Sequence, residues 1–540
     1  MKKTFITILF SSAVAVSSAA VPALSSAGSR TVNIPLEASH PSNPVAVDRK
    51  GDIIVTGVFE QDFSFNGSPL EAIGSSAYIL KYNQDLSEAW GVALVGASTI
   101  TAIDTDSEGN IYVAGTFADE VEFGTTFGYP IIKEGMMVDY AYTMKENASF
   151  IAKYNPDGRV LAVESFVPEY LPALVETGMY FPEDGDVYFA INHLEVDGDR
   201  VYASALYTGT TKHGDVDFDG SYYDAWGGGF YFMDMRSASV FSLSTADLSG
   251  CRKDANFAIA YPAMFAMEQA SSVAFTVENG VVYAGFVGTG SFSMQVGGNS
   301  YDPYFYADGD TGNNEYGYVM ASSAPGSAMV SLSTKSDNTN SAIFTIAGLV
   351  KSGDALYAVG NFDKTCPAVN GDGVDATGGT DIFVADVNAS SMSLISVTPY
   401  AHDEGSTLIN GETRPNYELA RSVAAIDGAL YINTVVNDFN RNYVGPASFW
   451  YDGGSYSRAQ VPATGVAATN GVAAMVQSDM STLSINKYSY QQSGITDIFD
   501  DSDDADAPVE YYDLQGRKVT DPAPGIYIRR QGKKVQKVKI

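Results

Sequence analysis

The segment "DVDFDG" at residues 215–220 holds the residues best suited to bind a metal ion. Asp215, Asp217 and Asp219 alternate before a glycine, as in the first half of a calcium-binding loop. Such a loop needs an acidic residue six positions after the glycine, where this chain has Trp226. We therefore expect no resident cofactor, and calcium bound by the three aspartates is the alternative.

Aromatic residues that could bind an organic ligand gather in three long segments, residues 136–144, 220–235 and 300–310. Exposed aromatic side chains at this density are typical of a surface that contacts protein or glycan. The alternative is that the rings pack on one another as a structured cap. The candidate ligand-binding residues are Tyr140, Tyr142, Tyr222, Tyr223, Trp226, Tyr301, Tyr304 and Tyr306.

Other kinds of chemistry have little support in the sequence. A formal net charge of -33 repels phosphate, so nucleic acid is not an expected partner. The 4 histidines are scattered, and no zinc helix, phosphate-binding loop or dinucleotide fingerprint occurs. Carboxylate pairs are frequent in so acidic a chain, and none stands out as an acid–base pair. Cys251 and Cys366 lie in different repeat units, so we expect two separate thiols.

A repeated phrase organises the chain around these residues. "AVDRKGDIIVTGVF" at 46–59 returns as "AIDTDSEGNIYVAGTF" at 102–117, and five later copies follow. Each copy predicts two strands joined at a glycine turn. A second phrase, such as "SFIAKYNPDGRVLAV" at 149–163, predicts two more strands. Repeated units of four antiparallel strands are typical of a β-propeller, and a parallel β-helix or a string of β-sandwiches is the competing fold.

The first two units resemble the bacterial extracellular β-propeller repeat family through "EGNIYVAGTF", "VEFG" at 121–124 and "SFIAKYN". The resemblance implies an all-β propeller, and the repeat copies extend it over residues 29–490. We expect seven blades, with six as the alternative. The strand expected at 29–38 pairs into the last blade and closes the ring. Small residues in the second strands suit the crowded ring interior, and they are Gly57, Gly115, Ala203 and Gly285.

Connection lengths divide the two faces of the predicted ring. In each unit the corners between strands one and two, and between strands three and four, are short. Because antiparallel strands alternate in direction, the short corners share one face and the longer connections share the other. The insertions should therefore rise from one face, which is often the binding face of a repeat fold. They are residues 118–148, 208–238, 287–327 and 363–380 within units, and residues 168–186 between the second and third units.

The two ends of the chain predict export. "MKKTFITILFSSAVAVSSAA" has the order of a secretory signal peptide, assigned to residues 1–27, with cleavage after Ala20 or after Ala27. No later apolar stretch is long enough to span a membrane. An acidic linker at 491–509 precedes a basic β-hairpin module at 510–540.

The C-terminal module resembles the sorting module of the type IX secretion pathway. "YYDLQGRKV", "PAPGIYI" and the basic ending "GKKVQKVKI" carry the match. The resemblance implies the secretion machinery as a partner and passage across the outer membrane. We expect an extracellular or outer-membrane surface location, and the periplasm is the alternative.

Together these features predict an exported, non-enzymatic propeller that binds a protein or glycan on its insertion-bearing face. A propeller enzyme acting on polysaccharide is the alternative. Two carboxylates converging on a cleft near the ring axis would favour the enzyme. A broad aromatic surface without such a pair would favour binding.

Overall fold

The computed structural model describes a chain of β-strands, with no helix among the described residues. Accordingly, no helix of the described part has the length and apolar character to cross a membrane. The structure describes residues 22–35, 43–124, 131–134, 148–169, 187–226, 229–234, 236–259, 270–289, 292–296, 299–301, 315–322, 329–333, 344–363, 365–366, 374–376, 379–400, 406–409, 412–415, 417–438, 443–460, 462–479, 481–490, 509–512, 518–520, 526–531 and 534–539.

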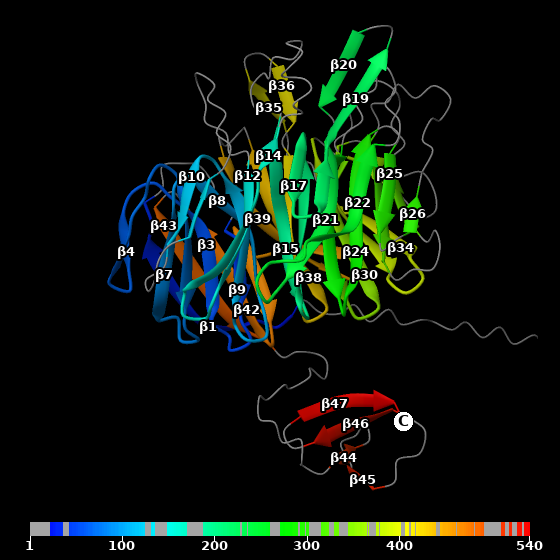
Figure 1. The fold of residues 1–540 in the computed structure, drawn as a ribbon. Helices are drawn as coiled ribbons and strands as arrows, with labels where there is room; N and C mark the ends of the chain where they lie inside the picture. Colours follow the sequence, from blue (N-terminus) through cyan, green and yellow to red (C-terminus); the bar gives the residue numbers. More distant parts are fainter. Residues whose placement is uncertain are drawn as a thin grey trace, which may run out of the picture.

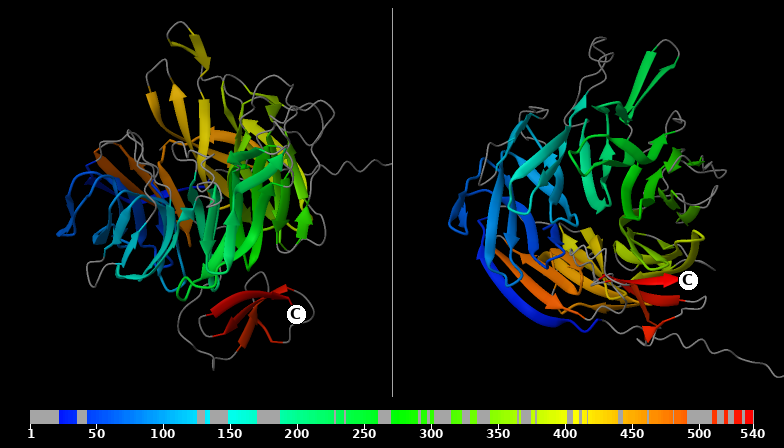
Figure 2. Two further views of the ribbon diagram at one scale, coloured as in Figure 1. Left: turned by 45° about the horizontal axis from the view of Figure 1, so that its top comes forward. Right: turned by 60° about the horizontal axis from the view of Figure 1, so that its bottom comes forward.

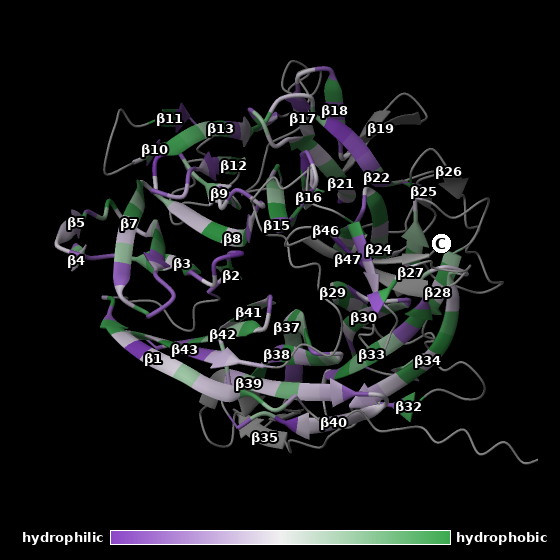
Figure 3. Cartoon of the chain, turned by 90° about the horizontal axis from the view of Figure 1, so that it is seen from below, coloured by the Kyte–Doolittle hydropathy of each residue, from purple (hydrophilic) through white to green (hydrophobic). Residues whose placement is uncertain are grey.

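Seven sheets of the described chain share an antiparallel four-stranded meander, and Figure 3 shows them around a central opening. The predicted all-β propeller is therefore confirmed. The sheets are numbered in chain order and listed from the inner to the outer strand, so sheet 1 consists of β2 (Val45–Val47), β3 (Ile53–Phe59), β6 (Ser76–Tyr82) and β7 (Glu88–Val95). Sheet 2 consists of β8 (Ser98–Thr105), β9 (Ile111–Phe117), β12 (Ala148–Tyr154) and β13 (Val160–Phe166). Sheet 3 consists of β15 (Phe189–Asp197), β16 (Arg200–Tyr207), β21 (Ser237–Ser244) and β22 (Arg252–Ile259). Sheet 4 is β23 (Ala270–Glu278), β24 (Val281–Thr289), β27 (Glu315–Ala321) and β28 (Met329–Ser333), sheet 5 is β29 (Phe344–Ser352), β30 (Ala355–Phe362), β33 (Asp381–Asn388) and β34 (Ser393–Tyr400), sheet 6 is β37 (Tyr417–Ile426), β38 (Ala429–Asp438), β39 (Tyr443–Asp452) and β40 (Ser455–Arg458), and sheet 7 is β41 (Gly465–Thr469), β42 (Val472–Ser478), β43 (Thr482–Ser489) and β1 (Ser25–Asn33).

The hydrophobic core lies between neighbouring sheets. Phe123 packs on Phe150 with ring centroids 4.9 Å apart, and Ile79 of sheet 1 belongs to the same buried cluster. Each sheet therefore has two buried faces, which explains why strands such as β6 and β12 are buried at every position. Cys251 and Cys366 lie in different clusters and form no disulfide, as expected.

Sheet 4 corrects one predicted boundary. The insertion expected at 287–327 contains β27, which pairs with both β24 and β28 as the third strand of the sheet. The outer strand β28 (Met329–Ser333) follows it in the chain. The aromatic sequence "EYGYVMA" had been counted with the insertion, but Tyr318 and Met320 are only 1% and 0% exposed. The connection on this sheet is therefore residues 290–314.

The N-terminal strand closes the ring, as predicted, but it spans Ser25–Asn33 instead of the expected 29–38. β1 pairs antiparallel with β43, from Ser25 opposite Ser489 to Asn33 opposite Thr482. In the right-hand view of Figure 2, β1 (dark blue) follows the outside of the orange strands of sheet 7. The pairing joins segments more than four hundred residues apart in the chain.

Side chains around β1 tie sheet 7 to sheet 1. Arg30 forms an ion pair of 2.6 Å with Glu88 on β7, and Ile34 is 1% exposed in the core between the two sheets. Because β1 begins at Ser25, cleavage after Ala27 would remove its first three residues. Of the two predicted cleavage positions, the one after Ala20 leaves the whole strand in the mature chain.

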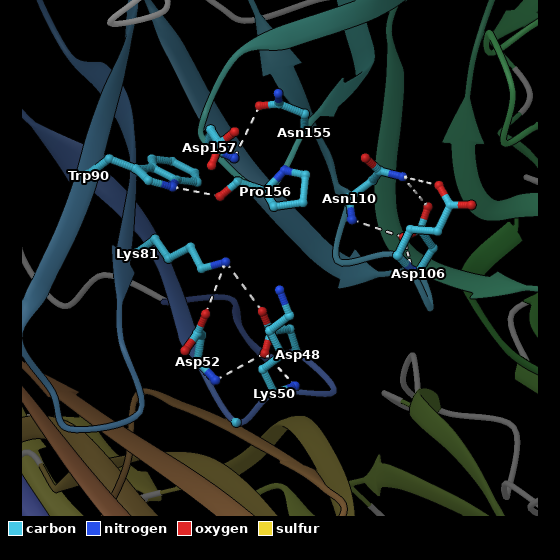
Figure 4. Close-up of polar contacts among 12 residues, drawn as sticks. Asp48, Lys50, Asp52, Lys81, Trp90, Asp106, Asn110, Asn155, Pro156 and Asp157 are labelled. Carbon is cyan, nitrogen blue, oxygen red and sulfur yellow. Dashed lines mark hydrogen bonds and ion pairs between the residues drawn. The ribbon is translucent and has the colours of Figure 1, made fainter. Parts of the chain in front are cut away.

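Three of the short corners, at 48–52, 106–110 and 155–159, are the same turn, drawn in Figure 4. The side-chain oxygen of Asp48, Asp106 or Asn155 accepts hydrogen bonds of 2.8 to 3.1 Å from the backbone N–H groups two and four residues later. The glycine at the fourth position has a φ of 81° to 83°, which favours glycine over any L side chain. The repeated acidic residue and glycine of the sequence therefore build turns.

The face of the ring formed by these corners is called the tight-turn face, and the opposite face is the insertion-bearing face. The hairpin of β19 (Ser221–Trp226) and β20 (Gly229–Asp234) projects beyond the ring at the top of Figure 1. The hairpin of β35 (Ser406–Ile409) and β36 (Glu412–Pro415) does the same. The described long connections therefore leave the ring on the predicted side.

Two insertions fold back along the rim instead of rising from the face. β10 (Glu120–Phe123), from the sheet 2 connection, pairs with the outer strand β7 of sheet 1. β25 (Phe292–Val296), from the sheet 4 connection, pairs with the outer strand β22 of sheet 3. Each insertion thereby covers the free edge of the preceding sheet, which otherwise presents unpaired backbone groups.

The C-terminal tail forms a separate four-stranded antiparallel sheet, in the order β45-β44-β46-β47. Its strands are β44 (Val509–Tyr512), β45 (Lys518–Val519), β46 (Ile526–Gln531) and β47 (Lys534–Lys539). β46 and β47 pair antiparallel from Ile526 opposite Lys539 to Gln531 opposite Lys534.

Candidate ligand-binding channel

The inner strands enclose a central channel with two compartments. The first has a volume of about 600 Å³ and is lined by the early residues of the inner strands, including Thr101, His193, Ser272 and Arg421. Because the inner strands run from the insertion-bearing face to the tight turns, this insertion-side compartment lies toward the insertion-bearing face. The second, turn-side compartment has a volume of about 850 Å³ and is lined by the last residues of inner strands, including Asp104.

β-Bulges shape the insertion-side compartment. The inner strands of sheets 2 to 6 each carry one extra residue that has no directly opposed partner on the second strand. A bulge redirects side chains and often lies beside a functional site. Four of the extra residues line the compartment, and they are Thr101, Asn192, Ala347 and Arg421.

These bulge residues are not evident from the sequence. A bulge depends on the register between two strands, and no residue letter in "ITAIDT" or "AINHLEV" marks it. The one available signal was Arg421, a charged residue within the otherwise apolar stretch "LARSVAAI". Arg421 and Asn192 are the two described bulge residues on this compartment that are exposed to solvent.

Two carboxylates lie near the ring axis on neighbouring inner strands, but each is bonded to the next sheet. Asp104 of β8 accepts hydrogen bonds from the backbone N–H groups of Val196 on β15 (2.7 Å) and of Thr105 (2.8 Å). Glu195 of β15 accepts one from the backbone N–H of Val277 on β23 at 2.8 Å, and its other oxygen is 3.1 Å from His193 Nε2. These carboxylates therefore bridge adjacent sheets.

Burial raises the pKa of Asp104 to about 7, against the opposing effect of its two backbone hydrogen bonds. Between about pH 4 and pH 7 the folded state therefore holds a proton that the unfolded state has lost, so stability falls as the pH rises. Asp104→Asn mimics the protonated form at every pH. We expect the melting temperature of the variant, measured by calorimetry, to rise relative to that of the wild type as the pH increases from about pH 4 to about pH 8.

Asp85→Asn is the matched control for this titration. The pKa of Asp85 is lowered by hydrogen bonds from the Ser87 side chain and backbone, so its contribution to stability is lost as the pH falls. The melting temperature of the wild type should therefore exceed that of this variant above the pKa of Asp85, and the two should converge in acid. A pH-independent difference for Asp104→Asn would contradict the raised pKa.

The predicted aromatic residues lie on separate hairpins where the structure describes them. Tyr222, Tyr223 and Trp226 belong to β19, which pairs with β20 on the projecting hairpin. Tyr301 ends β26 (Asn299–Tyr301), which extends sheet 3 beyond β25 along the rim. The remaining candidates lie outside the described residues, and they are Tyr140, Tyr142, Tyr304 and Tyr306. Ligand binding by this set stays a prediction.

The three predicted calcium ligands lie on a β-hairpin. Asp215 is in the turn, and Asp217 and Asp219 belong to β18 (Val216–Asp219), which pairs with β17 (Thr210–His213). All three are exposed, and the Lys212 amine is 4.0 Å from Asp217. Within the described ranges, no group of three or more His, Cys, Asp or Glu residues is arranged to hold a metal ion. Calcium binding by these residues stays a prediction.

No protein-family model and no curated protein matches the sequence. Among solved structures, BamB from Moraxella catarrhalis matches with 11% identity over 87% of this chain and 100% of that chain, at a TM-score of 0.33. A protein of unknown function from Dyadobacter fermentans matches with 8% identity over 87% and 100%, at a TM-score of 0.37. An α-L-arabinanase of Penicillium chrysogenum complexed with arabinobiose matches with 11% identity over 80% and 99%, at a TM-score of 0.34. Because likenesses this distant say nothing of activity, the function of this chain has to be argued from its own residues.

Proposed function

We propose that this chain is an exported or cell-surface β-propeller that binds a protein or glycan on its insertion-bearing face, without catalysis. The observation that carries the proposal is the difference between the two faces of the ring. On the tight-turn face, polar groups are used within the turns, as where Asp106 accepts from Glu108, Asn110 and Tyr112. On the opposite face the chain maintains long connections that the ring itself does not need.

The proposed location rests on the two ends of the chain. Its first residues have the charge and apolar order of a secretory leader, and its last residues have the phrases of a type IX sorting module. Formation of an independent sheet by β44 to β47 supports treating the tail as a separate module that contacts the secretion machinery. The mature protein then reaches the extracellular side or the outer-membrane surface.

Shortening the β19–β20 hairpin tests the proposed face. Ser221 and Asp234 are directly opposed, so residues 222–233 can be replaced by an Asn-Gly turn that keeps their pairing. We expect the replacement to weaken ligand binding at least about tenfold, because buried aromatic contacts are typical binding hot spots. The measurement is a screen of glycans and surface proteins with the intact chain, followed by titration of each hit with the variant.

The β35–β36 hairpin supplies a matched control on the same face. Ser406 and Pro415 are directly opposed, and residues 407–414 contain no aromatic side chain. Replacing those residues by the same turn should leave binding unchanged. Unchanged binding after removal of the aromatic hairpin would place the ligand elsewhere.

An enzyme acting on polysaccharide is the second candidate, and Asp104 and Glu195 are the residues that favour it. Their carboxylates lie on adjacent inner strands and interact electrostatically. Their hydrogen bonds to the next sheet speak for a structural role, because a general acid or base must be free to reach the substrate. Release of reducing sugar ends from acidic and neutral polysaccharides distinguishes the two candidates.

A further inference from the structure

We propose that the insertion-side compartment binds a monoanionic sugar of the uronic acid type, with Arg421 as the partner of its carboxylate. The proposal rests on the binding function above and names the chemistry of the ligand. It assigns that role to a residue outside the aromatic segments and to a site at the ring axis.

Arg421 is a cation without a partner among the described residues of a strongly acidic protein. It is exposed, it lines the insertion-side compartment, and it is the sole Lys or Arg among the described lining residues. Within the described part of the chain its side chain has no hydrogen-bond or ion-pair partner. The formal net charge of -33 offers many carboxylates that could have paired with it. A guanidinium left free in a cavity is suited to a bidentate contact with a ligand carboxylate.

Three hydroxyl groups add hydrogen-bond donors to the same compartment. Ser272 accepts from the backbone N–H of Ile346 at 2.9 Å, Thr345 accepts from the Asn361 amide at 2.8 Å, and Ser422 accepts from the Asn433 amide at 2.9 Å. Each hydroxyl oxygen is thus already an acceptor, and its own O–H remains available to donate. These donors suit a ligand rich in oxygen acceptors.

The charged side chains that line the two compartments determine which net charge of a ligand is favoured. Asp104, Asp106, Asp197 and one cation, Arg49, line the turn-side compartment, deeper along the axis than Arg421. Burial keeps Asp104 partly protonated near pH 7, so the remaining carboxylates outnumber Arg49 by a small margin. An anion that enters from the insertion-bearing face therefore meets Arg421 first and then a compartment with a small excess of negative charge. This field stops the anionic group in the first compartment and disfavours a doubly charged ligand such as a phosphate ester.

The compartment is large enough to hold a sugar ring. A volume of about 600 Å³ is in the range of pockets for small ligands. Its walls include small side chains and backbone, such as Ala347 and Gly348, between the donor groups. One carboxylate at Arg421 and several ring hydroxyl oxygens at Ser272, Thr345 and Ser422 would use these donors together.

Titration calorimetry with D-glucuronate and with neutral D-glucose tests the proposal on the full chain. We expect saturable binding of glucuronate at one site per chain and much weaker binding of glucose. Arg421→Gln should weaken glucuronate binding by about 10- to 100-fold, the loss typical of one hydrogen-bonded charge pair. Arg421→Lys should recover part of the affinity, because it restores the charge without the bidentate geometry. An oligogalacturonate tests whether the end of an acidic chain enters the same site.

Arg159→Gln is the matched control, since it removes the same charge from an exposed residue of the tight-turn face. It should leave glucuronate affinity unchanged. Absence of saturable glucuronate binding at millimolar concentration, equal binding of glucose, or equal losses in the two arginine variants would overturn the proposal.

Failure of this inference is distinguishable from failure of the proposed function. If binding of a screened ligand depends on the β19–β20 hairpin while glucuronate does not bind, the proposed binding face is supported and the uronate site is contradicted. If glucuronate binding depends on Arg421 but removal of the hairpin changes the binding of no ligand, the channel site is supported and binding by the aromatic surface is contradicted.

Discussion

A chain that begins at Leu36 is expected to fail to hold its native ring at room temperature. It lacks β1, whose backbone pairs with β43 from Ser25 to Asn33, and it lacks Ile34, which is 1% exposed in the core. Loss of one buried isoleucine alone costs about 2 to 5 kcal/mol, and whole domains are stable by only about 5 to 15 kcal/mol. The missing strand also exposes β43 as a free edge, which promotes aggregation.

Two chains that begin at earlier residues extend this test to a series of truncations. A chain beginning at Val21 keeps all of β1, whereas one beginning at Gly28 loses the Ser25 and Ser26 pairs and the Leu24 side chain, which packs on the core near Tyr488. Melting temperatures should fall in the order Val21, Gly28, Leu36. Equal melting of the first two would show that the strand can lose its first residues freely.

A peptide of residues 22–35 is the control for the shortest chain. Because β1 is an outer strand, the peptide can pair with β43 from outside, and it should restore the melting transition in a concentration-dependent way. A peptide with the same composition in scrambled order should not. Full stability of the Leu36 chain without peptide would contradict ring closure by β1.

Gly115→Ala is expected to destabilise the protein by about 3 kcal/mol or more, the upper range for overpacking. A Cβ at Gly115 would lie 1.9 Å from the backbone oxygen of Thr99 and 2.9 Å from the Phe150 ring. The close oxygen belongs to the strand β8 just before its bulge, so relief requires a backbone shift at the channel wall. Urea unfolding of wild type and variant measures the difference.

Gly285→Ala is the matched control in the equivalent strand of sheet 4. The nearest atom to its added Cβ is Ile346 Cδ1 at 3.1 Å, the end of a side chain that can rotate away. We expect a change below about 1 kcal/mol. Similar losses in both variants would show that the second strands are uniformly crowded, as the sequence alone suggested for Gly57, Gly115, Ala203 and Gly285.

The first two units show what local sequence is able to predict. The turn at 106–110 is specified within five residues, because Asp106 binds the N–H groups of Glu108 and Asn110 and Gly109 accepts a positive φ. The alternation of strand direction then assigns the short corners to one face without any coordinates. The pairing of the N-terminal strand with sheet 7 was predicted on a different ground, a strand-like segment that precedes the first unit.

Sheet 4 and the aromatic segments show where that logic fails. A strand such as β27 and an insertion can have the same aromatic composition, and only burial of Tyr318 and Met320 between sheets separates them. Likewise, whether an insertion rises from the face or pairs with a neighbouring sheet depends on a free edge in a different unit, as for β10 on β7.

By itself, the sequence determined the repeat and the turns, because each depends on contacts within a few residues. It also determined the side of the ring that carries the insertions, because that depends on strand direction. Only the tertiary structure decided the channel. The bulge at Arg421 arises from the register between β37 and β38, and the bonds of Asp104 and Glu195 arise from the approach of separate sheets. Such features depend on distances between units, and no single unit of the repeat encodes them.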